Sequence, residues 1–171
     1  MLIASSFLIF LLNAITLPTG YEQAHWGMSV SELEKIAELH KASAGSEYQY
    51  ADHMETNPDV YVSILPDKRV EYYFFQQKLY KIYLVYNKSF DTGTDSDAFY
   101  QALVQQHTDQ YGKAHNTFQE TVYGIKVQHN AWMNDDSVLD LRSGAGYVYQ
   151  VRLDRKAAAA KTLLQQFRHS I

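Results

Sequence analysis

Residues 70–86 read VEYYFFQQKLYKIYLVY, two runs of aromatic and β-branched residues separated by the polar Gln76, Gln77 and Lys78. Such side chains fit the pleated, half-buried surface of a sheet, and a short polar break between two runs is typical of a hairpin turn. The stretch therefore predicts two antiparallel strands at the centre of the fold.

The second of these strands has one apolar face and one mixed face, because side chains alternate along a strand. The apolar face would consist of Tyr80, Ile82, Leu84 and Tyr86, joined from the first strand by Tyr72 and Phe74. The mixed face would carry Lys81 and Tyr83, with Tyr73 beside them. We expect the apolar face to pack against helices and the mixed face to stay open to solvent.

Helix signals precede strand signals twice along the chain. Ser29 and Glu32 form a capping-box pattern that begins a helix expected to run to about residue 41. A second helix should run from Thr94 or Asp95 to Tyr111, and a third should follow Asp154. Strands are expected over residues 48–51, 60–65, 117–123, 126–133, 137–142 and 147–153.

The fold class is therefore α+β, an antiparallel sheet of about six to eight strands with two or three helices packed on one face. The order of elements would also fit a duplicated α-β-β-β unit. The length of 171 residues suits one well-buried core. We expect residues 21–171 to form a single domain, with 26–90 and 91–171 as its possible halves.

The first 20 residues have a different character from the rest. An apolar run over residues 7–12 is followed by Pro18 and Gly20. The run is shorter than the roughly 20 residues of a membrane span and is typical of a secretory leader. We expect residues 1–20 to be a cleaved signal peptide, the mature chain to begin between Ile15 and Tyr21, and the location to be periplasmic or secreted. The alternative is a buried N-terminal segment of a cytosolic domain.

Composition narrows the range of partners. The formal net charge is −4 and the isoelectric point is near 5.9. A chain with this charge has no general attraction to the phosphate backbone, so nucleic acid is not expected as a partner. The chain has no Cys, so it has neither a disulfide framework nor a thiol nucleophile nor a Cys-based zinc site. No stable membrane span is expected once the leader is removed.

Candidate catalytic or metal-binding side chains are few and have simpler interpretations. Asp135 and Asp136 follow Asn134 in a stretch typical of a turn. The stretch Asp52-His53-Met54-Glu55 has no second His at helical spacing, and His107 and His115 flank a helix end. We assign no catalytic residue, metal ligand or cofactor. A small hydrolase using carboxylate or His side chains on loops at the rim of the sheet stays open as an alternative.

The 14 Tyr residues carry the clearest functional signal. A core of this size cannot easily bury so many rings and satisfy every hydroxyl, and Tyr is a common contact residue at surfaces. Seven aromatic residues fall on six of the expected strands and are the candidate binding residues: Tyr61, Tyr73, Tyr83, Tyr123, Trp132, Tyr147 and Tyr149. The alternative is that these rings fill the core and cross-strand pairs.

The element order resembles the tandem helix-plus-meander fold of the β-lactamase inhibitory protein family. The stretch Trp26-Gly27-Met28-Ser29 is similar to the Gly-Met-Ser/Thr helix opening of small exported bacterial domains, although this chain lacks their lipidated Cys. The resemblance implies a fold that displays a concave sheet and does not catalyse a reaction. The function expected from the sequence is thus a non-enzymatic module that binds a protein or glycan partner.

Overall fold

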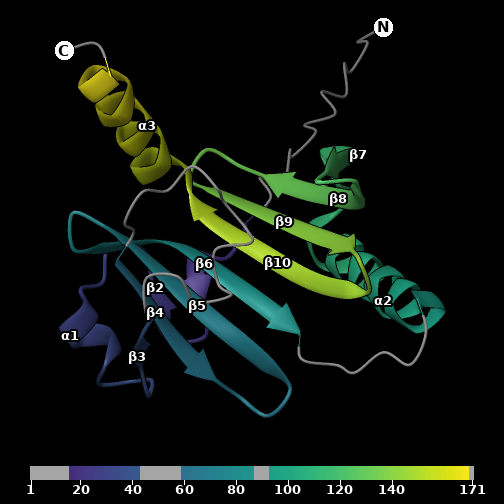
Figure 1. Cartoon of the computed structure of the whole chain (residues 1–171), viewed down its shortest axis with the longest axis horizontal. Helices are drawn as coiled ribbons and strands as arrows, with labels where there is room; N and C mark the ends of the chain where they lie inside the picture. Colours follow the sequence, from purple (N-terminus) through teal and green to yellow (C-terminus); the bar gives the residue numbers. More distant parts are fainter. Residues whose placement is uncertain (1–15, 43–58, 87–92, 170–171) are drawn as a thin grey trace, which may run out of the picture.

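The computed structural model describes residues 16–42, 59–86 and 93–169 (Figure 1). Within these residues the fold is α+β, with an eight-stranded antiparallel sheet, a two-stranded sheet and three helices. The helices are α1 (Val30–Leu33), α2 (Gly93–Tyr111) and α3 (Arg155–His169). The strands are β1 (Gly20–Tyr21), β2 (Ala24–His25), β3 (His40–Lys41), β4 (Asp59–Ile64), β5 (Lys68–Phe75), β6 (Lys78–Tyr86), β7 (Asn116–Val122), β8 (Ile125–Met133), β9 (Ser137–Gly144) and β10 (Tyr147–Asp154). The predicted fold class is confirmed.

Two four-stranded meanders make up the large sheet. Its strand order is β3-β4-β5-β6-β10-β9-β8-β7, so the last strands of the two meanders, β6 and β10, pair antiparallel at the centre. A helix precedes each meander, α1 the first and α2 the second. The element order thus repeats, with four strands in each unit of the large sheet.

The central hairpin forms as the sequence predicts. Phe75 pairs with Lys78, which leaves Gln76 and Gln77 as a two-residue turn with φ values of 50° and 62°. Two consecutive residues with positive φ are the mark of a type I′ turn, whose twist matches that of the flanking strands.

A β-bulge changes which side chains of β6 face which way. Tyr73 pairs with Lys81 and Phe74 pairs with Leu79, so Tyr80 is the extra residue. A bulge places two consecutive side chains on one side of a strand. The prediction that Tyr80 shares a face with Ile82 is therefore wrong, because Tyr80 packs with Tyr83 on the opposite face.

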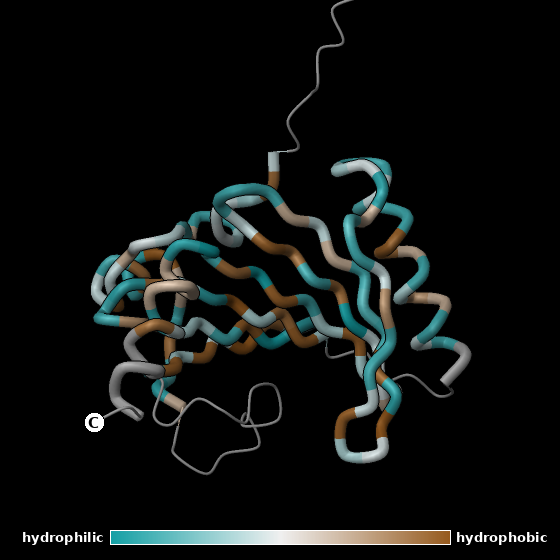
Figure 2. The backbone as a smooth tube through the Cα atoms, turned by 90° about the horizontal axis from the view of Figure 1, so that it is seen from above, coloured by the Kyte–Doolittle hydropathy of each residue, from teal (hydrophilic) through white to brown (hydrophobic). Residues whose placement is uncertain are grey.

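The face that carries Ile82 is covered by α1 and α2, and we call it the helix face. One cluster on it joins Leu33 of α1 to side chains of β5 and β6, including Tyr72, Phe74 and Ile82. α2 packs over β9 and β10, and Tyr100 joins Trp132 and the buried Leu17 in a second cluster. Figure 2 shows brown apolar positions alternating with teal polar ones along the strands. Two helices thus share one face, as predicted.

The third helix begins on the other face of the sheet. Ala157 packs against the cluster that contains Tyr80 and Tyr83, and Lys161 Nζ donates a hydrogen bond of 2.7 Å to the Tyr80 hydroxyl. The Asp154 carboxylate caps α3 by accepting from the backbone N–H groups of Lys156 and Ala157 at 2.9 and 3.1 Å. This N-cap was predicted, and it is confirmed.

The first helix is much shorter than predicted. α1 ends at Leu33, turns follow, and His40 and Lys41 form β3 by pairing with Val62 and Tyr61 of β4. Residues 34–41 have good helix propensity, but propensity is a weak preference that tertiary pairing overrides. Here the edge of β4 offers backbone hydrogen bonds that a longer helix would forgo. The strand predicted over residues 48–51 lies outside the described residues.

The second helix ends as the sequence indicates. Gly112 follows Tyr111 with φ of 78°, and its N–H donates to the Thr108 carbonyl at 2.8 Å. Glycine tolerates this left-handed conformation, so the predicted C-terminal cap is confirmed. None of the helices in the described part of the chain combines the length and apolar character needed to cross a membrane.

Ser29 provides a direct test of the first helix start. Its hydroxyl accepts from the Glu32 backbone N–H at 3.3 Å, and its own N–H donates to the Glu32 carboxylate at 2.7 Å. We expect Ser29→Ala to lower the free energy of unfolding by about 0.5–1 kcal/mol, the lower half of the usual range, because α1 is short. Ser29→Gly is the matched control and should cost only a few tenths. If Ser29→Ala and Ser29→Gly lowered the free energy of unfolding equally in urea denaturation, the hydroxyl would not act as the cap.

Candidate functional site

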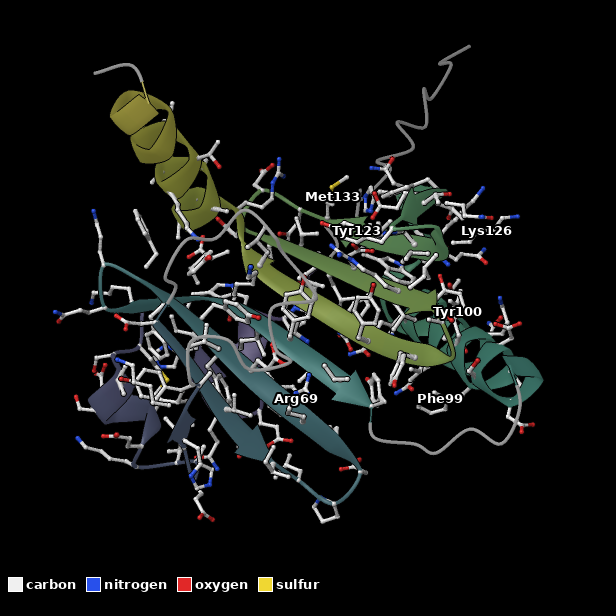
Figure 3. All side chains as sticks on the ribbon, in the orientation of Figure 1. Arg69, Phe99, Tyr100, Tyr123, Lys126 and Met133 are labelled. Atoms are coloured by element: carbon white, nitrogen blue, oxygen red, sulfur yellow. The ribbon has the colours of Figure 1, made fainter. Side chains whose placement is uncertain are left out.

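The sheet face opposite α1 and α2 carries most of the buried charges, and we call it the polar-aromatic face. Strand register places its residues in rows across five or six strands. One row contains Glu71, Tyr83, Val151, Asp140 and Ala131. The next contains Arg69, Val85, Tyr149, Arg142, His129 and Phe118. Figure 3 shows Arg69 on the β5 side of the sheet and Tyr123 and Lys126 on the β7–β8 side.

Three tyrosines lie together at the centre of this face. The ring centroids of Tyr73 and Tyr83 are 5.6 Å apart, and those of Tyr83 and Tyr149 are 6.3 Å apart. The Lys81 ammonium lies 4.2 Å from the Tyr73 centroid and 5.5 Å from that of Tyr83. At these distances the ring quadrupoles attract the cation. Tyr73 and Tyr83 therefore pack around a lysine on strand β6, and the Tyr80 ring centroid lies 5.8 Å from the same ammonium.

Tyr73 and Tyr83 are not open to solvent as the sequence suggested. They are only 5% and 1% exposed. Val60 and Val62 from β4, Val151 from β10 and the start of α3 pack against them. The expectation of an uncovered face at the sheet centre is therefore wrong, because the sheet is covered there on both sides.

A first ionic group lies on β5. The Glu71 side chain accepts from Arg69 at 2.8 Å through Nε and approaches Arg69 Nη2 at 2.7 Å. The Tyr73 hydroxyl donates to the other Glu71 oxygen at 2.8 Å. Glu71 is 2% exposed, and a buried carboxylate is tolerated only when such partners satisfy it.

A second ionic group joins β7, β8 and β9. His129 places Nε2 3.0 Å from the Glu120 carboxylate and Nδ1 3.1 Å from the Asp140 carboxylate. Arg142 Nε donates to the same Asp140 oxygen at 2.6 Å. The Phe118 ring stacks on the imidazole with centroids 4.3 Å apart. With both nitrogens close to carboxylates and its ring covered by Phe118, the buried His129 connects β7, β8 and β9.

The charge states of this face follow from its burial. Burial alone would lower the pKa of Arg142, but the neighbouring Tyr83, Asp140 and Tyr149 outweigh it and raise that pKa overall. Burial raises the pKa of Tyr149, and Arg142 opposes the rise. At neutral pH the face thus holds a cationic guanidinium 5.9 Å from the centre of a neutral tyrosine ring.

The accessible part of the polar-aromatic face lies at the β7–β8 and β9–β10 turns and on the adjoining strand β7. Phe118, Tyr123, Ile125 and Tyr147 are 48%, 77%, 44% and 62% exposed, and we call these four side chains the aromatic patch. Gly144 pairs with Tyr147, and a Cβ at Gly144 would lie 3.0 Å from Val127 Cγ2. Glycine therefore leaves room for β8 and its apolar side chains to pack close to the turn that presents Tyr147.

The structure separates the seven aromatic residues proposed from the sequence. Tyr61 faces the helix side, where its ring meets that of Phe74 edge-on at 5.6 Å. Trp132 is fully buried in the helix-face core, and its indole N–H donates to the Gly112 carbonyl at 2.7 Å. Tyr73, Tyr83 and Tyr149 lie together, as do Tyr123 and Tyr147 at the turns. The strand register decides this sorting.

The sequence did not single out Phe118, Ile125 or the second ionic group. Asp140 and Arg142 alternate with Leu139 and Leu141 in β9, so a period of two residues marked a polar face there. Their pairing with His129 depends on register between strands.

The other candidate side chains do not converge on a site. The Asn134 side chain accepts from the N–H groups of Asp136 and Ser137 at 3.0 and 2.8 Å, so the predicted turn is confirmed. Burial lowers the pKa of His107, which lies against Trp132, whereas the His115 ring accepts from the Met133 N–H at 3.2 Å. Asp52, His53 and Glu55 lie outside the described residues. No group of three His, Asp or Glu side chains in the described ranges could hold a metal.

Two depressions are separate from the ionic groups, and the first borders the turns of the aromatic patch through Lys126 and Gly146. One, of about 220 Å³, lies between the start of α2 and β8, and Ser96, Gln119, Gln128 and Ser143 are among its lining residues. The other is lined by Trp26, Asp136 and Lys156, among others. Neither contains a member of the ionic groups. Comparisons with protein-family models, curated proteins and solved structures find no match to this chain, so the geometry of the polar-aromatic face carries the functional argument.

Proposed function

We propose that this protein is an exported, non-enzymatic binding module whose aromatic sheet face contacts a protein or glycan partner. The observation that carries the proposal is the aromatic patch, in which four large apolar side chains are exposed around two neighbouring turns. Aromatic side chains offer a large apolar surface, and in Tyr and Trp a polar group that stays hydrated. Tyr and Trp are enriched among the residues that dominate binding energy at interfaces.

The patch is built on a rigid support. Phe118 stacks on His129, which the carboxylates of Glu120 and Asp140 hold in place. Tyr147 begins β10, the strand that pairs with both β6 and β9. Side chains fixed before binding lose little conformational entropy when a partner arrives, which favours affinity.

A protein is the better supported partner class. Phe118 and Ile125 are wholly apolar, whereas a sugar face needs hydrogen-bonding groups beside each aromatic platform. The resemblance of the element order to the β-lactamase inhibitory protein family points the same way. A glycan is the other outcome that the experiment below can give.

Export rests on the apolar run at residues 7–12, and the position of Leu17 limits where a leader could be cleaved. Leu17 is 2% exposed and packs with Tyr100 and Trp132 on the helix face. Cleavage after this residue would remove a buried side chain. The expected start of the mature chain therefore narrows from the interval between Ile15 and Tyr21 to a residue no later than Leu17.

The test uses two exposed residues whose loss should not unfold the protein. The double variant Tyr123→Ala and Tyr147→Ala should keep the free energy of unfolding within about 0.5 kcal/mol per site, as is usual for surface positions. It should weaken partner binding at least tenfold, about 1.4 kcal/mol. The partner is isolated by crosslinking in a bacterial periplasmic extract, and the same proteins are applied to a glycan array.

The matched control removes two apolar side chains exposed elsewhere. Ile64 and Leu163 are 59% and 57% exposed and lie outside the aromatic patch. The Ile64→Ala and Leu163→Ala double variant should bind as the wild type does. Equal binding by the patch variant and the wild type, to protein and glycan alike, would refute the proposal.

A further inference from the structure

The two outer strands of the large sheet differ in how their edges are protected. β3 has two residues, and Lys41 pairs with Asp59 at 3.3 Å. β7 has seven residues, six of them exposed, and contains no Lys, Arg or Pro. Proteins commonly protect an outer strand by making it short or by placing Lys or Pro on it. β7 has none of these protections.

The one charged residue of β7 does not guard the edge. Glu120 is turned onto the sheet face, where its carboxylate lies 3.0 Å from His129 Nε2. β7 pairs along its whole length with β8, and no strand in the described part of the chain pairs with its other side. α2 packs mainly over β9 and β10. About half of the N–H and C=O groups of β7 therefore point outward as a template for another strand.

We infer that β7 pairs with β7 of a second copy of this chain, as an antiparallel dimer with a two-fold axis at Gln119. The residues around the axis read Thr117-Phe118-Gln119-Glu120-Thr121. Under this symmetry Gln119 opposes Gln119 of the second copy, Thr117 opposes Thr121, and Phe118 opposes Glu120. A symmetric interface must be self-complementary in this way.

The side chains fit this register. Thr–Thr and Gln–Gln are favourable cross-strand pairs, and the two Glu120 carboxylates do not oppose each other. The half-exposed Phe118 of each copy would lie against the neighbouring strand, which removes apolar surface from water. The two eight-stranded sheets would become one continuous sheet with the polar-aromatic faces on the same side.

This dimer does not rest on the proposed binding function. It would cover part of Phe118, but its test changes none of the four side chains of the aromatic patch. The purified protein should have about twice the mass of its single chain in light scattering after size exclusion, where the full 171-residue chain is 19.7 kDa before any leader is removed. Gln119→Lys should raise the dissociation constant at least tenfold, because two lysines then face each other at the axis. Gln128→Lys is the matched control. Gln128 is exposed on β8 directly beside Gln119, so this variant adds the same charge one strand away from the outer edge. It should stay dimeric.

Charge complementation distinguishes this interface from any other. Mixing the Gln119→Lys variant with the Gln119→Glu variant should restore a dimer of one copy of each, because the two-fold axis places residue 119 opposite itself. Thermal unfolding confirms that each variant is folded. A wild type that is monomeric at all accessible concentrations, a dimer that Gln119→Lys leaves unchanged, or a mixture that fails to pair would each overturn the inference.

Discussion

Replacing Ile82 with Ala should lower the free energy of unfolding by about 2–5 kcal/mol, and replacing Tyr83 with Ala should lower it by about 3–5 kcal/mol. The two side chains are adjacent on β6 and point to opposite faces, yet they are 0% and 1% exposed. Ile82 packs with Leu33 and Tyr72 on the helix face. Tyr83 packs with Tyr73 on the polar-aromatic face. Each truncation would leave a cavity in a close-packed cluster.

Tyr147→Ala provides the matched control, because the same side chain is 62% exposed at the β9–β10 turn. It should change the free energy of unfolding by no more than about 0.5 kcal/mol. Urea denaturation of the three variants measures the difference. If Tyr83→Ala were as stable as Tyr147→Ala, the centre of the polar-aromatic face would be open to water in solution and available to a partner.

Asp140→Ala should lower the free energy of unfolding by about 3–5 kcal/mol, the range for removing one partner from a buried ion pair. The Asp140 side chain is 11% exposed and lies within 3.1 Å of both His129 and Arg142. Its loss leaves the Arg142 guanidinium buried without this carboxylate. Asp140→Asn keeps the volume, so its effect separates loss of charge from loss of packing.

The surface pair Lys156–Asp136 is the control for this prediction. Its side chains are 78% and 60% exposed, and its N–O distance is 2.7 Å. Water screens such a pair, so Asp136→Ala should leave stability close to that of the wild type. Comparable losses from Asp140→Ala and Asp136→Ala would mean that the second ionic group is solvated and does not hold β7, β8 and β9 together.

Local chemistry explains why much of the fold could be predicted from the sequence. The alternating aromatic residues of 70–86 specify a hairpin because a strand presents successive side chains to opposite sides. Ser29, Gly112 and Asp154 specify helix ends, because each satisfies backbone groups a few residues away. These interactions lie within short segments, so the sequence alone determines them.

The candidate site depended on relations between segments. The sequence identified Tyr123 and Tyr147 but not Phe118, whose position on His129 arises from the β7–β8 register. The alternation of Asp140 and Arg142 with Leu139 and Leu141 marks a polar side of β9, but it does not indicate which side chains of other strands these residues meet. Their ionic group forms because three neighbouring strands bring side chains from residues 120–142 into adjacent rows on one face of the sheet.

By itself, therefore, the sequence determined β4 to β10, the turns between neighbouring strands, the helix caps and the repeated order of elements, but not the short strands β1, β2 and β3. Only the tertiary structure decided that α1 stops at Leu33, that a bulge turns Tyr80 away from Ile82, and that Tyr83 is buried. The reason is physical. Caps and alternation involve contacts over a few residues, whereas edge pairing, bulges and coverage of a face depend on segments far apart in the chain that compete for the same backbone hydrogen bonds and apolar surface.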